Sequence, residues 1–150
     1  MNKFQKIIAI HTMLFTSAFL LNYFWEILHT PLYVSTMNHD FFSYMYMAAV
    51  DTFLVFFIYW IVCLQARTFL WLDEFLKHSV LIIVSGIFLS FFIEVKNVYF
   101  THVWTYTAAM PIIPFLQIGL SPVLQMIITP LVTFYVTKGI LKWVSRISER

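Results

Sequence analysis

Three acidic residues lie inside stretches that are otherwise apolar enough to cross a lipid bilayer: Glu26, Asp51 and Glu94. A carboxylate at the centre of a bilayer costs at least about 2.5 to 3.5 kcal/mol on insertion scales, so such residues usually have a use. Carboxylates shielded from water can exchange protons in acid/base catalysis, bind an ion or anchor a polar substrate group. We therefore predict a buried polar site in which Glu26, Asp51 and Glu94 are the candidate catalytic residues.

A histidine and an amide accompany Glu26 on the first apolar stretch. Asn22, Glu26 and His29 are spaced i, i+4, i+7, so a helix places them on one stripe, with Trp25 beside it. We predict His29 as an assisting catalytic residue and Asn22 and Trp25 as substrate-binding residues. The Glu26-x-x-His29 spacing also occurs in metal-binding bundles, typically twice per bundle, whereas it occurs once here. The alternative to a functional role is structural: Glu26 and His29 pair with each other and with lipid headgroups.

A dense polar and aromatic stretch follows Glu94. Its predicted substrate-binding residues are Asn97, His102, Trp104 and Tyr106. An interfacial belt of Trp and Tyr is the ordinary interpretation of such residues. We favour a lid over the site, because Met110, Pro111 and Pro114 make a stiff entry into the next apolar stretch. Such a lid would separate the carboxylates from bulk water.

Two amides and a serine mark the last apolar stretch. Gln117, Ser121 and Gln125 are spaced i, i+4, i+8, so one helix would direct all three to the same side. We predict Gln117 and Gln125 as substrate-binding residues. Hydrogen bonding between helices is an equally weighted alternative.

No metal or cofactor signature stands out, so we predict no metal ligands and leave the cofactor open. Thioether and imidazole groups together suit copper(I), and this remains a minor alternative on the outer side. The residues concerned are His29, Met37, His39, Met45, Met47, His102 and Met110.

These residues must be positioned by helices in a membrane. Of 150 residues, 61% are hydrophobic and 11% charged, which is too apolar for a soluble domain of this size. The length suits one integral membrane domain, residues 1–150, built as an all-α bundle of four transmembrane helices. The predicted spans cover about residues 7–30, 41–65, 77–99 and 112–136, with a bend near Gly119 to Pro122 and an amphipathic tail at 138–150.

The distribution of basic residues predicts the orientation. With four spans, both termini lie on one side, and basic residues favour the cytoplasm. Placing the termini inside puts eight cations there and only Lys96 outside. We therefore predict a protein of the plasma (inner) membrane with both termini cytoplasmic. The eight are Lys3, Lys6, Arg67, Lys77, Lys138, Lys142, Arg146 and Arg150.

Three functions are compatible with this pattern. The first is a small membrane-embedded enzyme that uses a carboxylate pair, Glu26 or Asp51 with Glu94, for acid/base chemistry on a lipidic or amphipathic substrate. The second is a proton- or cation-coupled transporter, which would need a dimer to line a pathway. The third is an accessory subunit of a larger membrane complex. We rank the enzyme first because the polar groups gather on one side of the membrane.

The predicted partners are membrane lipids and a lipidic substrate. A homodimer or a larger membrane partner is left as an alternative. Nucleic acid is excluded, because the basic residues form no continuous stripe.

Overall fold

The computed structural model describes residues 2–35 and 40–148. Within these ranges the protein is built on four α-helices: α1 (Lys3–His29), α2 (Phe41–Ala66), α3 (Phe75–Val95) and α4 (Leu120–Ser148). Short helical turns follow α1 at Thr30–Leu32 (η1), precede α3 at Trp71–Glu74 (η2) and extend it at Lys96–Phe100 (η3). All four helices, taken with these turns, are long and apolar enough to cross a membrane.

Two small antiparallel sheets connect the helices. Strand β1 (Tyr33–Ser35) pairs with β2 (Trp104–Tyr106), so that Tyr33 lies opposite Tyr106. Strand β3 (Ile112–Ile113) pairs with β4 (Ile118–Gly119) to form a hairpin just before α4. The first sheet joins the segment after α1 to the segment after α3.

The ends of the helices follow from local chemistry. The side chain of Asn2 accepts the Gln5 N–H while the Gln5 side chain accepts the Asn2 N–H, a capping box that starts α1. Asp40 starts α2 by accepting the Ser43 backbone N–H at 2.8 Å, and this bond lowers the pKa of the Asp40 carboxyl. Pro31 lies just beyond α1, as expected of a residue that cannot continue a helix.

The first three predicted spans agree with the observed helices within a few residues, but the fourth is wrong at both ends. Residues 112–119 form the β3–β4 hairpin, in which Gln117 adopts a left-handed conformation with φ of 52°. Gly119 therefore precedes the first turn of α4 instead of bending a longer helix. Pro122 is tolerated because an N–H there would have no helical partner. The segment predicted as a surface tail continues α4 as far as Ser148.

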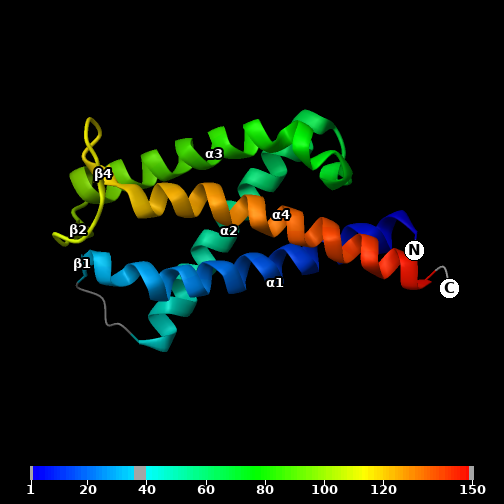
Figure 1. Ribbon diagram of the computed structural model, residues 1–150, viewed down its shortest axis with the longest axis horizontal. Helices are drawn as coiled ribbons and strands as arrows, with labels where there is room; N and C mark the ends of the chain where they lie inside the picture. Colours follow the sequence, from blue (N-terminus) through cyan, green and yellow to red (C-terminus); the bar gives the residue numbers. More distant parts are fainter. Residues whose placement is uncertain (1, 36–39, 149–150) are drawn as a thin grey trace.

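Helices α1, α3 and α4 run along the long axis of the molecule, and α2 crosses them obliquely (Figure 1). Helix α2 packs mainly on α1 and much less on α3. Strands β1 and β2 lie at one end of the bundle, whereas the first turn of α1 and the last turns of α4 lie at the other. At that second end, Lys6 of α1 and Lys138 of α4 both contact Asp73.

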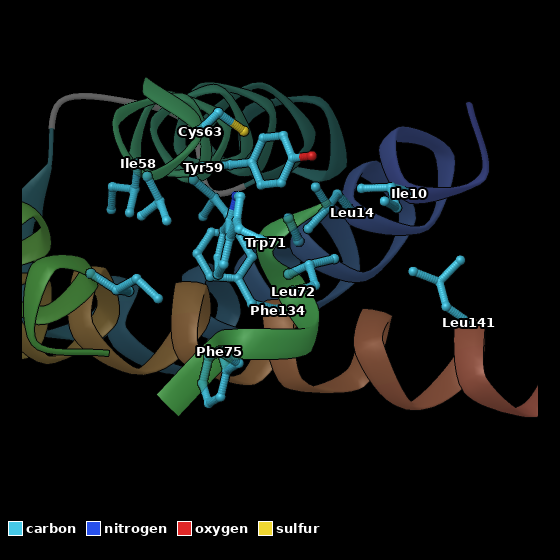
Figure 2. Packing of buried hydrophobic residues seen from close by; sticks show 14 residues of the cluster. Ile10, Leu14, Ile58, Tyr59, Cys63, Trp71, Leu72, Phe75, Phe134 and Leu141 are labelled. Carbon is cyan, nitrogen blue, oxygen red and sulfur yellow. The ribbon is translucent and has the colours of Figure 1, made fainter. Parts of the chain in front are cut away.

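A hydrophobic core fills the half of the bundle nearest the ends of the chain. Figure 2 shows Tyr59 of α2, Trp71 of η2 and Phe134 of α4 gathered together, with Leu14 of α1 nearby. The Trp71 ring lies 5.3 Å from that of Phe134 and 5.6 Å from that of Tyr59. The buried Tyr59 hydroxyl donates to the Phe69 carbonyl at 2.7 Å. Packed side chains therefore fill the centre of this half of the bundle, and a second hollow of about 760 Å³, lined among others by Lys6, Asp73 and Lys138, lies at its end.

Helices α3 and α4 approach closely at Gly86. An ideal Cβ at Gly86 would lie 2.0 Å from the Met126 carbonyl oxygen, so no larger residue fits. The residue four positions after Met126 is Pro130, which has no N–H and leaves that carbonyl without its regular helical donor. The Met126 carbonyl, which lacks its helical donor, therefore meets α3 at Gly86, which has no side chain. Small residues allow the same close approach between membrane helices.

Candidate functional site

A cavity of about 570 Å³ lies at the β1–β2 end of the bundle. Its size is that of a small-molecule site. All four α-helices contribute to its wall, and the predicted residues Glu26, His29, Asp51, Glu94 and Gln125 all line it. These residues lie on four helices that are far apart in the sequence, so the tertiary packing of the bundle brings them together.

The floor of the cavity is buried and polar, and the rim is exposed. Glu26, Glu94 and Gln125 are 5%, 2% and 3% exposed. The exposed lining residues are Tyr46 and Val50 on the outer half of α2, with Lys96 and Val103 at the end of α3 and beyond it. Because α2 packs little on α3, the opening lies on the side of the bundle between these two helices.

The amide of Gln125 joins three acceptors. Its Nε2 atom lies 3.2 Å from Asn22 Oδ1, 3.1 Å from Glu26 Oε1 and 2.8 Å from Asp51 Oδ2. An amide NH₂ has two protons, so the three acceptors compete for them. The Glu26 and Asp51 carboxylates touch the same nitrogen, which brings them close together in a poorly solvated place. One proton or one cation held between them would remove the repulsion.

His29 connects this network to the start of α4. His29 Nε2 lies 3.1 Å from Glu26 Oε1, and Nδ1 lies 3.1 Å from the Ser121 hydroxyl oxygen. A neutral imidazole has one donor and one acceptor, so it can pass a proton between its two partners. Because His29 lines the cavity, its ring can take part in acid/base chemistry there together with Glu26.

Glu94 lines the cavity from α3 and is hydrogen-bonded to the β1–β2 sheet. The Tyr106 hydroxyl of β2 donates to Glu94 Oε2. Burial raises the pKa of Tyr106, and the neighbouring Glu94 raises it further, so the phenol keeps its proton and remains the donor. Burial likewise raises the pKa of Tyr33, which lies opposite Tyr106 in the sheet and 5.8 Å from the Trp104 ring. The β1–β2 sheet thus covers the cavity with Tyr33 and Trp104 in its wall.

Replacing Tyr106 with phenylalanine should loosen this lid, because it removes the donor to Glu94 and leaves that buried group unpaired. Hydrogen bonds to charged groups contribute about 1.5 to 3 kcal/mol. We expect roughly tenfold faster amide hydrogen exchange in residues 104–106, measured by mass spectrometry. The control is Tyr99→Phe, since the Tyr99 hydroxyl contacts only the carbonyls of Leu116 and Gln117. Equal exchange in the two variants would contradict the role of the Tyr106–Glu94 bond.

Other predicted residues lie around the cavity or away from it. Asn97 and Trp104 line it, and Asn22 is fully buried beneath it against Gln125. Trp25 is half-buried and does not line it.

Two predicted substrate-binding residues lie at the surface. His102 is exposed, with φ of 50°, and Gln117 is exposed with its amide donating to the Pro114 carbonyl. Both lie outside the cavity wall. For Gln117 the reason is the β3–β4 hairpin. The hairpin removes Gln117 from the helical stripe that it was expected to share with Ser121 and Gln125.

Sequence reasoning missed Tyr33 and Ser90. Ser90 precedes Glu94 by one helical turn on α3, so the i, i+4 spacing could have identified it. For Tyr33 the pairing of β1 with β2 decides the position, and nothing local signals that pairing. Of the outer methionine and histidine residues, Met37 and His39 lie outside the described ranges. Within 2–35 and 40–148, no three His, Cys, Asp or Glu side chains could hold a metal together.

The site is therefore defined by its own geometry: carboxylates from three helices, one imidazole and one bridging amide around one cavity, with Glu26 and Glu94 buried and Asp51 half-buried. A scan against family models, a search of curated proteins and a search of solved structures each gave no match to this chain.

Proposed function

We propose that the chain is an integral membrane protein that acts as an enzyme, using Glu26, Asp51, Glu94 and His29 for acid/base chemistry on a lipidic or amphipathic substrate. The observation that carries the proposal is the convergence of carboxylates from α1, α2 and α3 on one cavity. Acid/base groups of this kind typically accelerate a reaction by about 10² to 10⁴.

Membrane insertion is supported by the four long apolar helices and by the charge distribution along the bundle. Among the described residues, Lys96 is the one Lys or Arg at the cavity end, and the others lie toward the opposite end. In the proposed orientation the basic end faces the cytoplasm and the cavity opens on the outer side. The described ranges begin and end at the same end of the bundle, as an even number of spans requires (Figure 1).

The arrangement supports proton transfer on both sides of a bound molecule. Glu26 and Asp51 share the Gln125 amide on one wall, and Glu26 also contacts His29. Glu94 lies on another wall and is held by Tyr106. One carboxyl group can therefore donate a proton while another accepts one, as in isomerisation, hydration or group transfer.

The packed core between the cavity and the opposite end of the bundle favours an enzyme over a carrier. A transport route would have to pass the packed side chains of Leu14, Tyr59, Trp71 and Phe134, all at most 2% exposed. The cavity instead lies at one end of the bundle and opens toward the side, between α2 and α3. An apolar substrate can enter such an opening from the lipid without crossing the membrane.

The proposal is tested by lipid mass spectrometry on nanodiscs made from native lipid extract, comparing wild-type protein with Asp51→Asn. We expect the wild type to convert a lipid species over time and Asp51→Asn to do so about 100-fold more slowly. Asp73→Asn, an exposed change at the opposite end, is the control and should retain full activity.

Two results would contradict the proposal. Proton- or cation-dependent flux in proteoliposomes that Asp51→Asn abolishes, without conversion of any lipid, would identify a carrier. Stoichiometric co-purification of a larger membrane protein, with no effect of Asp51→Asn, would identify an accessory subunit.

A further inference from the structure

Two hydrogen-bonding groups in the cavity wall make no regular hydrogen bond within the described residues. The Ser90 hydroxyl of α3 is 2% exposed, lines the cavity and makes no hydrogen bond. The Trp104 indole N–H of β2 is also buried and makes no hydrogen bond of regular geometry, although it lies near the Glu94 carboxyl group. Buried polar groups are normally satisfied, and each unpaired one costs about 1 to 3 kcal/mol. An indole N–H can only donate, so Trp104 requires an acceptor.

The neighbouring carboxylates have the opposite requirement. Asp51 and Glu94 line the same cavity, and an ionised carboxylate can only accept hydrogen bonds. In the part of the chain that the structure describes, no Lys, Arg or His side chain forms an ion pair with either of them. Asp51 accepts from Gln125 and Glu94 accepts from Tyr106, and each carboxyl group has further lone pairs. A ligand can therefore donate to either of them while it accepts from Trp104.

Much of the remaining wall is apolar, although Lys96 and Asn97 also line the cavity. Val50 and Leu54 of α2, Ile93 of α3 and Met126 of α4 line it. Val50 is exposed on the outside of the bundle as well, so this apolar surface continues to the rim that would face lipid. A hydrocarbon chain can occupy this region without losing contact with an apolar surrounding.

We propose that the cavity binds an amphiphile whose apolar chain carries a hydroxyl group, which names the substrate class of the proposed function and rests on it. The hydroxyl donates its proton to the Asp51 or Glu94 carboxylate and accepts from Trp104 Nε1–H, with Ser90 as a further partner. An ammonium head group cannot accept the indole proton. A carboxylate head group cannot donate, and it faces three acidic side chains in the wall against the single lysine, Lys96.

The test measures binding of dodecanol, dodecylammonium and dodecanoate to the protein in nanodiscs, with empty nanodiscs subtracted to remove partition into lipid. We expect dodecanol to bind most tightly. Trp104→Phe and Ser90→Ala should each weaken dodecanol binding about fivefold, because each removes one neutral hydrogen bond. Trp60→Phe on the exposed face of α2 and Ser79→Ala, whose hydroxyl bonds only within its own helix, are the matched controls.

Tighter binding of dodecylammonium or dodecanoate than of dodecanol would overturn the assignment of a hydroxyl. So would dodecanol binding that both cavity variants leave unchanged while their melting temperatures match those of the controls. Failure of the enzyme proposal is distinguishable from these results: specific dodecanol binding supports the hydroxyl site even where no lipid is converted. Conversion of a lipid that carries no hydroxyl would overturn the hydroxyl proposal and leave the enzyme proposal standing.

Discussion

Replacing Gln125 with glutamate is expected to destabilise the protein more than any other single change at the site. The wild-type amide nitrogen lies within 3.2 Å of Asn22 Oδ1, Glu26 Oε1 and Asp51 Oδ2. In Gln125→Glu an oxygen that accepts hydrogen bonds replaces the amide nitrogen, so all three attractive contacts become repulsive. The new carboxyl group also lies beside those of Glu26 and Asp51. Leaving a buried charge uncompensated costs about 3 to 5 kcal/mol. That is a large share of the about 5 to 15 kcal/mol that stabilises a typical protein.

The measurement is the free energy of unfolding in a fixed detergent, compared with Gln65→Glu. Gln65 is an exposed residue near the end of α2, and this control should change stability by no more than about 0.5 kcal/mol. Gln125→Met removes the donor without adding a charge and should fall between the wild type and Gln125→Glu. Equal stability of Gln125→Glu and Gln65→Glu would show that the amide does not hold the carboxylates together.

Replacing Gly86 with alanine is expected to force α3 and α4 apart. The added Cβ would lie 2.0 Å from the Met126 carbonyl oxygen, and a backbone atom in a helix cannot move aside as the end of a side chain can. Overpacking of this kind typically costs about 1 to 3 kcal/mol, and we expect the upper end of that range. The ends of α3 and α4 beyond this contact carry Glu94 and Gln125, so the cavity should be distorted as well.

Gly139→Ala provides a control for which the expected change in stability has the opposite sign. Gly139 also lies in α4, but a Cβ there would meet nothing within 4 Å. Alanine is more favourable than glycine in a helix by about 1 kcal/mol, so this variant should be more stable than the wild type. The measurement is the melting temperature of Gly86→Ala and Gly139→Ala in the same nanodiscs, each compared with the wild type. A shift in the same direction for both would mean that the close approach at Gly86 is not a constraint.

The sequence was sufficient to predict the first three helices and most of the cavity floor. Long apolar runs with capping and breaking residues identify α1, α2 and α3, because helix ends depend on local chemistry. The carboxylates could be assigned to the interior because their cost in lipid allows few other positions. Their convergence depended on assuming a bundle with a polar interior, and the cavity lined by Glu26, Asp51 and Glu94 agrees with that assumption.

Predictions based on helical spacing failed where the chain is not helical. Gln117 was assigned to a stripe with Gln125, yet the β3–β4 hairpin separates them, with Gln117 in a left-handed conformation that a side chain of its type rarely adopts. The hydrogen bond from Leu120 N–H to the Pro111 carbonyl, which closes this hairpin, cannot be read from composition. The same holds for Tyr33, whose position depends on pairing with a strand more than seventy residues away.

In the proposed membrane setting, the oblique course of α2 (Figure 1) is expected to make the width of the opening depend on the thickness of the bilayer. The half of α2 that carries Ile58, Tyr59 and Val62 is fixed in the core, whereas the half that carries Tyr46 and Val50 forms the rim. Helices adapt to hydrophobic mismatch chiefly by tilting. In a thinner bilayer α2 would lean further while its anchored half stays in place, so lipid composition alone would change how readily a long-chain molecule enters.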